Sequence, residues 1–187
     1  MRCFVAIELP DDVRRQLGKL QQRFEDLGRA VRWVRPKAIH LTLKFLGDVL
    51  DRDLTAVSQA VDDVASQCSP FDFVVQSTGC FPPRGGVRVV WVGVTETSGT
   101  LAACQRLCEN AMGALGFPKE SRPYVPHLTL GRVKDPRRAV NLRERVNDHA
   151  DFEAGVVPAN ELILFESRLS PQGAQYVPVH RAAFPGP

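Results

Sequence analysis

Two segments of the chain carry the same set of residues that can transfer protons and bind anions. Residues 35–43 read RPKAIHLTL and residues 122–130 read RPYVPHLTL, so six of nine positions are identical, and His40 and His127 are 87 residues apart. An imidazole titrates near neutral pH and can serve as a general acid or a general base. A threonine hydroxyl can donate a hydrogen bond to a phosphate oxygen. The duplicated segment therefore suits a reaction that needs both a proton donor and a proton acceptor, with hydroxyls that can bind phosphate oxygens.

The spacing within each segment predicts where its side chains point. In a strand, residues i and i+2 lie on the same face. His40 and Thr42 would therefore share one face, with the intervening leucine in the core, and His127 and Thr129 would repeat this arrangement. The repeat predicts two related halves about a pseudo-twofold axis. A single His-x-Thr is most often structural, but two copies favour a joint active site in which two imidazoles and two hydroxyls converge.

Neither segment contains a carboxylate, so the sequence favours a reaction without a metal ion, and we expect no cofactor. A hydrolytic metal site would normally add Asp, Glu or a third histidine. No motif surrounds the other two histidines. We expect His149 on the solvated surface and His180 in a structural role.

Hydrophobic periodicity places both segments in strands within a succession of helices and strands. Apolar residues at steps of three and four predict helices, and apolar runs closed by Gly or Pro predict strands. This order is typical of an α+β protein with mostly antiparallel sheets covered by helices. The expected helices span residues 11–27, 54–68, 100–115 and 137–149, and the expected strands span residues 2–9, 39–46, 71–76, 87–94, 127–133, 161–168 and 175–180.

Length and composition describe an ordinary globular protein. The 187 residues fit one compact domain. The net charge of +3 is a mild basic excess that suits a phosphate-bearing ligand but is weaker than that of dedicated nucleic-acid binders. No apolar run approaches the ~20 residues of a membrane helix, and the N-terminus lacks a secretion signal. We therefore expect a cytoplasmic protein that does not interact with membranes.

Five cysteines without a C-x-x-C pair are expected to be free buried thiols. Cys104 and Cys108 lie four residues apart on an expected helix, so a metal pair is conceivable. The apolar residues around them favour plain helix packing instead.

Several segments together resemble the bacterial and archaeal RNA 2′,3′-cyclic phosphodiesterases, also called 2′-5′ RNA ligases, of the 2H phosphoesterase superfamily. The resemblance covers nearly the whole chain. It implies one domain, residues 1–187, made of two intertwined lobes that each contribute one His-x-Thr-x motif. The implied α+β fold is bilobal, with two antiparallel sheets facing a central cleft and helices outside. The segments that carry the resemblance are residues 1–10, 40–47, 81–86, 126–132 and 165–176.

The resemblance also implies a reaction. It is metal-independent opening of a 2′,3′-cyclic phosphate at an RNA 3′ end to leave a 2′-phosphate, and similar members can join tRNA halves through a 2′-5′ bond. By this resemblance, His127 is the general base and His40 the general acid, whereas the near-symmetric motifs alone leave the two roles open. Thr42 and Thr129 would hold the non-bridging phosphate oxygens. The partner is RNA with cyclic phosphate ends, and a monomer suffices.

Two residues that follow the motifs are further candidates. By resemblance, Arg132 is a phosphate ligand, a role that suits a planar guanidinium. Strict alternation would place Arg132 on the leucine face, so a bulge or the strand's end must turn it. Phe45 could stack on a base, although a core aromatic is the favoured interpretation. Lys44 has the parity of the motif face and could add positive potential there, though a solvated lysine is equally plausible.

Other basic residues and other activities stay open. Arg84, Arg137 and Arg138 could attract an RNA backbone, although such clusters are usually solvated surface. The competing functions are cleavage of small cyclic phosphates and an RNA-end-binding module without turnover. Binding alone does not need an acid–base pair, which argues against the second of these.

Overall fold

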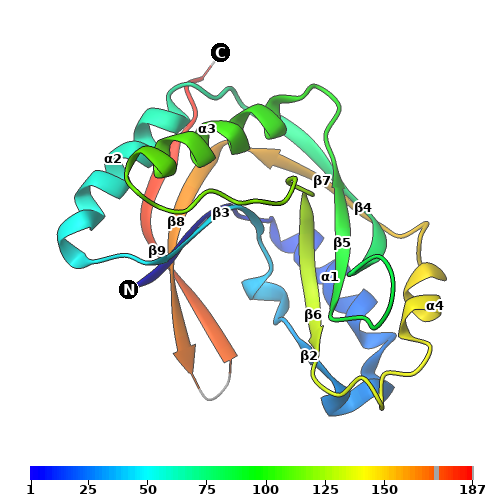
Figure 1. Cartoon of the computed structure of the whole chain (residues 1–187). Coiled ribbons are helices and arrows are strands. Elements are labelled where there is room, and N and C mark those ends of the chain that lie inside the picture. The colour runs from blue at the N-terminus through cyan, green and yellow to red at the C-terminus, as the bar shows by residue number, and fades with distance from the viewer. Residues whose placement is uncertain (171–172, 187) are drawn as a thin grey trace.

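The computed structural model describes residues 1–170 and 173–186, whose strands form two antiparallel sheets. The first sheet has the order β3-β1-β8-β9 and the second the order β2-β6-β5-β4-β7 (Figure 1). This confirms the expected α+β class with antiparallel sheets. In the first sheet lie β1 (Arg2–Ile7), β3 (Leu41–Asp48), β8 (Glu161–Ser170) and β9 (Gly173–Ala183), and in the second lie β2 (Val31–Trp33), β4 (Phe71–Phe81), β5 (Val89–Thr95), β6 (His127–Val133) and β7 (Glu153–Ala159).

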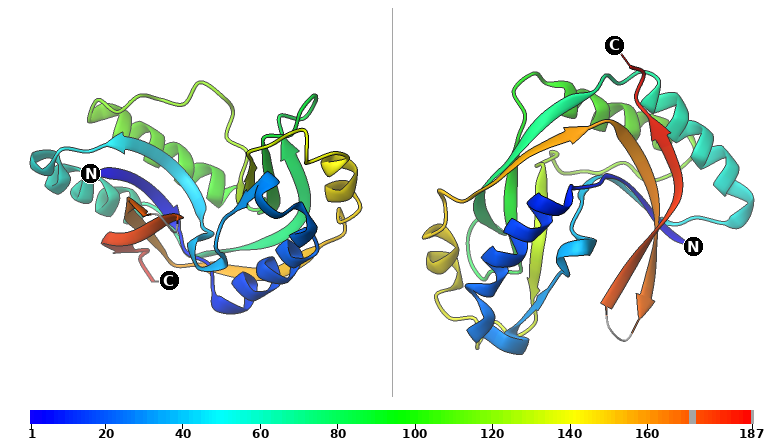
Figure 2. Two further views of the ribbon diagram at one scale, coloured as in Figure 1. Left: turned by 90° about the horizontal axis from the view of Figure 1, so that it is seen from below. Right: turned by 180° about the vertical axis from the view of Figure 1, so that it is seen from behind.

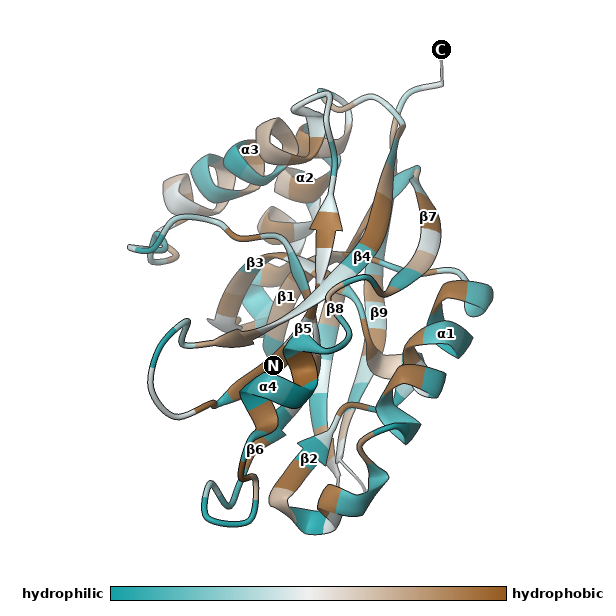
Figure 3. Ribbon diagram, turned by 90° about the vertical axis from the view of Figure 1, so that its right-hand side faces the viewer, coloured by the Kyte–Doolittle hydropathy of each residue, from teal (hydrophilic) through white to brown (hydrophobic). Residues whose placement is uncertain are grey.

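The helices divide between the two sheets. The pair α2 and α3 packs on the first sheet through β8, β9 and β3, whereas α1 packs on β7 and α4 on β4 of the second sheet (Figure 1). Each presents apolar residues to its sheet, as the apolar and polar sides of α1 in Figure 3 illustrate. The α-helices are α1 (Asp11–Gln22), α2 (Leu54–Ala65), α3 (Thr100–Ala114) and α4 (Leu142–Asn147), and short 3-10 turns span Glu25–Ala30, Pro36–Ala38 and Asp51–Asp53.

The chain passes repeatedly between the sheets. The N-terminal β1 pairs with both β3 and the C-terminal β8, and the short β2 pairs with β6 (Figure 2). Each sheet therefore contains strands from both ends of the sequence. The two His-x-Thr segments consequently fall in different sheets, on β3 and on β6.

Four element predictions need correction. The strand expected over residues 71–76 continues to Phe81 as β4. The helix expected over residues 11–27 ends at Gln22, and a 3-10 turn with Gly28 at φ +49° follows it. The helix expected near residues 137–149 shortens to α4. Strand β7 went unpredicted because Gly155, at φ +124°, and Pro158 both argue against a strand. β7 lies at the sheet edge, where the N–H that proline lacks is not needed for pairing.

The main apolar core extends across both sheets and the helices behind them, and a second, smaller buried cluster consists of Phe4, Ala6, Ile163 and Phe165. All five cysteines are free and buried, as expected, and Cys104 and Cys108 lie on the buried side of α3. The helix-packing interpretation of these two residues is therefore confirmed. Within residues 1–170 and 173–186, no helix is long and apolar enough to span a membrane.

Candidate active site

The two motif strands lie beside each other although they belong to different sheets. β3 contacts β6, and Tyr124, three residues before the second histidine, donates a hydrogen bond from its hydroxyl to the carbonyl oxygen of Thr42 at 3.1 Å. Tyr124 thus connects the segment that precedes the second motif to the first motif. The structure brings the duplicated segments together at one place, as the repeat predicted.

A β-bulge interrupts each motif strand at the same position of the repeat. On β6, Thr129 pairs with Trp91 and Gly131 with Val90, so Leu130 is an extra residue. On β3 the register likewise shifts after the motif threonine, so one leucine is again unmatched. Such an insertion reverses the alternation of side chains beyond it. Of the two features expected to turn Arg132, a bulge or the end of the strand, the structure shows a bulge, and β3 carries a second bulge that was not expected.

We call the side of β3 and β6 that carries His40, Thr42, His127 and Thr129 the motif face. The bulges determine which residues after the threonines lie on it. Beyond them, Arg132 on β6 and Phe45 on β3 fall on the same face as the histidines and threonines. Phe45 is 56% exposed, so its interpretation as a core aromatic is wrong. Lys44 turns to the other face and is buried, so neither sequence-based interpretation of that residue holds.

A glutamine from the helix behind each sheet reaches a bulge carbonyl. Gln21 of α1 donates to the carbonyl oxygens of Leu130 at 3.0 Å and Val34 at 2.7 Å. Gln105 of α3 lies 3.5 Å from the carbonyl oxygen of Leu43, a longer and weaker contact. The Leu130 carbonyl oxygen also accepts from the backbone N–H of Val34 at 2.8 Å, so Gln21 is a second donor to it. Both motif bulges are thus supported from the core side.

The two imidazoles have matching tethers. His40 Nδ1 lies 2.9 Å from the carbonyl oxygen of Ala38, and His127 Nδ1 lies 2.7 Å from that of Val125. A carbonyl oxygen can only accept, so Nδ1 carries the proton in both rings. Nε2 is then the atom left to take up or release a proton. Both histidines are oriented for proton transfer in the same way.

Aromatic neighbours desolvate both imidazoles. The His40 ring stacks on Phe4 at 4.5 Å and meets the edge of Tyr176 at 4.9 Å, and the His127 ring meets Phe81 at 4.9 Å. Burial lowers the His40 pKa to about 4, with a smaller contribution from a nearby positive charge. Burial also lowers the His127 pKa, assisted by the charge of Arg132. Both rings are therefore neutral at pH 7 before an anion binds.

The motif threonines leave their hydroxyls available. Thr42 and Thr129 are half-buried on the motif face. Among the residues that the structure describes, neither hydroxyl has a protein hydrogen-bond partner. Arg132 is exposed and, in the same part of the chain, makes no ion pair. The candidate site thus combines two neutral imidazoles with two hydroxyls and a guanidinium, groups that can transfer protons and bind an anion.

The chain matches the family model described as LigT-like phosphoesterase twice, over residues 7–91 and 92–176. The chain belongs to this family. The two matches divide the chain between the motifs, so each half carries one of them.

Relatives and solved structures of this family are similar over almost the full length. An RNA 2′,3′-cyclic phosphodiesterase of Methanothermobacter thermautotrophicus is 35% identical over 94% of this chain and 95% of its own. One from Thermotoga maritima is 28% identical over 100% and 97%. The crystal structure of a Thermus thermophilus protein has a TM-score of 0.84, with 26% identity over 100% and 99% of the chains. That of Escherichia coli LigT complexed with 3′-AMP has a TM-score of 0.78, with 26% identity over 98% and 97%.

In this phosphoesterase, Lys44 connects the two motif segments from the core side. Its ammonium group pairs with Glu109 of α3 at 2.7 Å and also donates to the carbonyl oxygen of Pro118. Glu109 in turn accepts from the backbone N–H of Glu120. The segment that leads from α3 to the second motif is therefore held against β3. Lys44 therefore fixes this segment from the core side of β3 and does not share a face with His40 and Thr42.

Sequence patterns did not reveal the aromatic residues around the histidines. Phe4 and Tyr176 flank His40, and Phe81 and Trp91 flank His127, but all four come from strands outside the motifs. A signal was present for Phe4, which shares strand parity with Arg2 and Ala6 on the face of β1 opposite Cys3, Val5 and Ile7. The positions of Tyr176, Phe81 and Trp91 beside the histidines depend on how the strands pair in the sheets, which the sequence pattern does not give.

Two cavities differ in their relation to the motifs. One of about 70 Å³ opens beside His40 and is lined by Arg14, Lys37 and Tyr176 among others. A larger one, of about 280 Å³, lies between the β4–β5 loop and α4, away from both motifs. Size alone does not make the second a reaction site, since its lining contains neither motif histidine.

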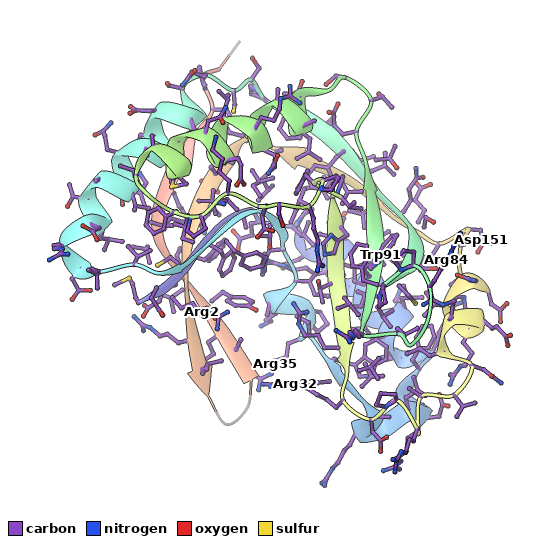
Figure 4. All side chains as sticks on the ribbon, in the orientation of Figure 1. Arg2, Arg32, Arg35, Arg84, Trp91 and Asp151 are labelled. Atoms are coloured by element: carbon purple, nitrogen blue, oxygen red, sulfur yellow. The ribbon has the colours of Figure 1, made fainter. Side chains whose placement is uncertain are left out.

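The remaining candidates lie outside the motif face. Arg84 is on the loop between β4 and β5, distant from Arg2 and Arg32 in Figure 4. His180 is structural as expected, with Nε2 2.7 Å from a carboxylate oxygen of Asp62. The other non-motif histidine, His149, is only partly solvated: its ring packs edge-on against Phe24 at 5.5 Å, and its Nδ1 lies 3.4 Å from Arg23 at the surface.

Proposed function

We propose that this phosphoesterase hydrolyses the 2′,3′-cyclic phosphate at an RNA 3′ end to a 2′-phosphate. The single observation that carries the proposal is the pair of imidazoles, each tethered through Nδ1, beside two unpartnered threonine hydroxyls on one face. Relatives with this family's fold are named RNA 2′,3′-cyclic phosphodiesterase, and their similarity over nearly the whole chain supports the same chemistry here.

In the proposed reaction, a water oxygen attacks phosphorus while Nε2 of His127 takes one of its protons. The bond between phosphorus and the 3′ oxygen breaks, and Nε2 of His40 donates a proton to that oxygen. The products are a 3′ hydroxyl and a 2′-phosphate. Thr42 and Thr129 donate hydrogen bonds to the non-bridging oxygens, where negative charge increases in the transition state. Arg132 adds a charged donor to the same phosphate.

The lowered pKa values set a condition on this assignment. His127 is neutral in the free protein and is ready to act as a base. His40 is also neutral at pH 7, because burial lowers its pKa to about 4. Its proton must arrive with the anionic phosphate, which favours the imidazolium form once bound. The pH dependence of kcat/KM should accordingly be bell-shaped, with both limbs below the ordinary histidine value of 6.5.

The test is to incubate a short RNA ending in a 2′,3′-cyclic phosphate with the protein in the presence of EDTA. The terminal phosphate position is then identified by NMR or by phosphatase mapping. We expect a 2′-phosphate from the wild-type protein and a loss of about 100-fold or more in kcat for His40→Ala and His127→Ala. His149→Ala, a histidine outside the motifs, is the matched control. Binding of the RNA without turnover would instead favour an end-binding module.

A sulfur-substituted substrate separates the roles of the two histidines. A 3′ bridging sulfur leaves without protonation, so it removes the need for a general acid. If His40 is the acid, His40→Ala should recover most of its activity on this substrate, whereas His127→Ala should not. The reverse pattern would exchange the two roles.

Arg132 and the ligation reaction have separate readouts. Arg132→Ala should keep its fold and lose cleavage activity by about tenfold, the effect of one lost charge-assisted hydrogen bond. Unaltered kinetics would remove Arg132 from the site. Ligation would be tested by supplying tRNA halves with a cyclic phosphate and a 5′ hydroxyl and searching for a 2′-5′ bond. Small cyclic nucleotides, the competing substrate class, are compared in the same assay.

A further inference from the structure

Three arginines gather beside the motif face from three different strands. Arg2 belongs to β1, Arg32 to β2 and Arg132 to β6. Figure 4 shows Arg2 and Arg32 on the same side of the molecule, near the β8–β9 hairpin. A Cβ atom at Gly173, where β9 begins, would lie 3.7 Å from Nη2 of Arg32. The Arg32 guanidinium therefore reaches from the second sheet to the first.

The strand register places two of these cations directly opposite each other. Arg32 pairs with Arg132 across the antiparallel β2 and β6. Like charges in that relation destabilise a sheet. Among residues 1–170 and 173–186, none of Arg2, Arg32 and Arg132 makes an ion pair with a carboxylate. Asp48 lies opposite Arg2 in the β1–β3 register but, in this described part of the chain, forms no ion pair with it. A cluster of guanidinium groups without ion pairs is suited to bind an anion.

Tyr176 relates this cluster to the proposed general acid. Its ring meets the edge of the His40 ring at 4.9 Å and the edge of the Phe4 ring at 5.0 Å. The positive charges of Arg132, Arg32 and Arg2 all act on its phenol. Tyr176 thus contacts the His40 ring and also lies within the electrostatic reach of the three arginines, so a polymer whose end lies at His40 could extend toward them.

The chemistry of the surroundings favours a nucleic acid strand over a free anion. Phe45, 56% exposed, lies on the same face and is opposite Phe4 in the β1–β3 register. Exposed aromatic rings between cationic groups are the combination that binds single-stranded nucleic acid, with bases on the rings and phosphates on the cations. A lone phosphate would use the arginines but not the aromatic ring.

We infer that Arg2 and Arg32, together with Arg132, bind the phosphodiester immediately upstream of the terminal cyclic phosphate. This rests on the proposed function, and it makes the substrate an oligonucleotide end and not a mononucleotide. Arg132 would contact both phosphates, and the upstream base would stack on Phe45.

Binding measurements test this without requiring turnover. The probes are adenosine 2′-phosphate, the dinucleotide ApA with a terminal 2′-phosphate, and the same dinucleotide with a neutral methylphosphonate linkage. We expect the charged dinucleotide to bind at least about fivefold more tightly than the methylphosphonate form. Arg32→Gln and Arg2→Gln should each remove most of that preference and lower the salt slope of log Kd by about 0.7. Arg106→Gln, an exposed arginine on α3, is the matched control.

The outcomes separate this inference from the proposed function. If the preference for the charged linkage exists but cyclic RNA is not hydrolysed, the arginine site stands and the proposed function falls. If cyclic RNA is hydrolysed but the charged and neutral linkages bind equally, the inference is overturned. It is also overturned if Arg32→Gln and Arg2→Gln retain the preference to the same degree as Arg106→Gln.

Discussion

Binding of a phosphate-like anion should return a proton to His40. Burial lowers the pKa of this imidazole from 6.5 to about 4 in the unliganded protein, which corresponds to about 3 kcal/mol against the charged form. An anion about 4 Å away, at an effective dielectric constant of about 20, would favour the charged form by about 4 kcal/mol. The attraction is enough to offset the desolvation. We therefore expect the pKa of His40 in the complex to reach or exceed its ordinary value.

The assay is an NMR titration of the histidine Cε1 resonances with and without sulfate, which stays dianionic over the range titrated. The four histidines are assigned from His-to-Gln variants, and chloride at equal ionic strength is the control. The reasoning would be refuted if free His40 titrated near its ordinary value of 6.5, or if sulfate bound and left a low pKa unchanged. In the second case His40 could not supply the proton to the leaving oxygen at neutral pH.

The same burial makes folding sensitive to acid. Because the folded protein holds His40 neutral below the pH at which the unfolded chain protonates it, the unfolded state binds more protons between pH 6.5 and about 4. The free energy of unfolding should fall through this window as the pH is lowered, by up to about 3 kcal/mol from this residue. His40→Gln should flatten that part of the profile in urea denaturation. An unchanged slope would show that the imidazole is not desolvated.

Three further substitutions test the framework around the site. Lys44→Met should lower the free energy of unfolding by about 3 kcal/mol, because it strands the buried carboxylate of Glu109. The double variant with Glu109→Gln should recover most of the lost free energy of unfolding, measured by urea denaturation. If it does not, the Lys44–Glu109 ion pair is not the cause of the loss. Gly79→Ala should displace the Trp91 ring that lies against Gly79, changing tryptophan fluorescence and lowering kcat/KM; if neither changes, the ring is not held there. Arg32→Gln should stabilise the protein by roughly 0.5 kcal/mol at low salt, because it relieves a cross-strand repulsion, and destabilisation would reveal a favourable partner.

Local sequence pattern was sufficient for the strands that carry the motifs. The alternation of leucines with polar residues in His-Leu-Thr-Leu predicted a half-buried strand. The duplication of this motif predicted that the strand of His40 lies beside the strand of His127. Local pattern was not sufficient for β7, where Gly155 and Pro158 oppose strand formation locally. Pairing with β4 at the edge of the sheet overrides that local preference.

Side-chain direction beyond the motifs depended on the bulges, which a pattern of residue types does not reveal. Strict alternation of side chains along β3 would place Lys44 on the same face as His40 and Thr42. The register shift on β3 instead buries it and turns Phe45 outward. On β6, strict alternation put Arg132 on the leucine face, and the bulge moves it to the motif face. The cluster of Arg2 and Arg32 was also out of reach, because it forms only when β1, β2 and β6 are brought together.

The bulges also explain how a nearly twofold site can accept a substrate that has no twofold symmetry. Up to the threonine, the two strands present the same side chains with the same imidazole tethers. Beyond each bulge, the next side chain on the motif face is different in the two strands. It is the aromatic ring of Phe45 on β3 and the guanidinium of Arg132 on β6. A base is attracted to the first and a phosphate to the second. In the proposed reaction this difference fixes the orientation of the RNA end, and the orientation determines which histidine faces the leaving oxygen.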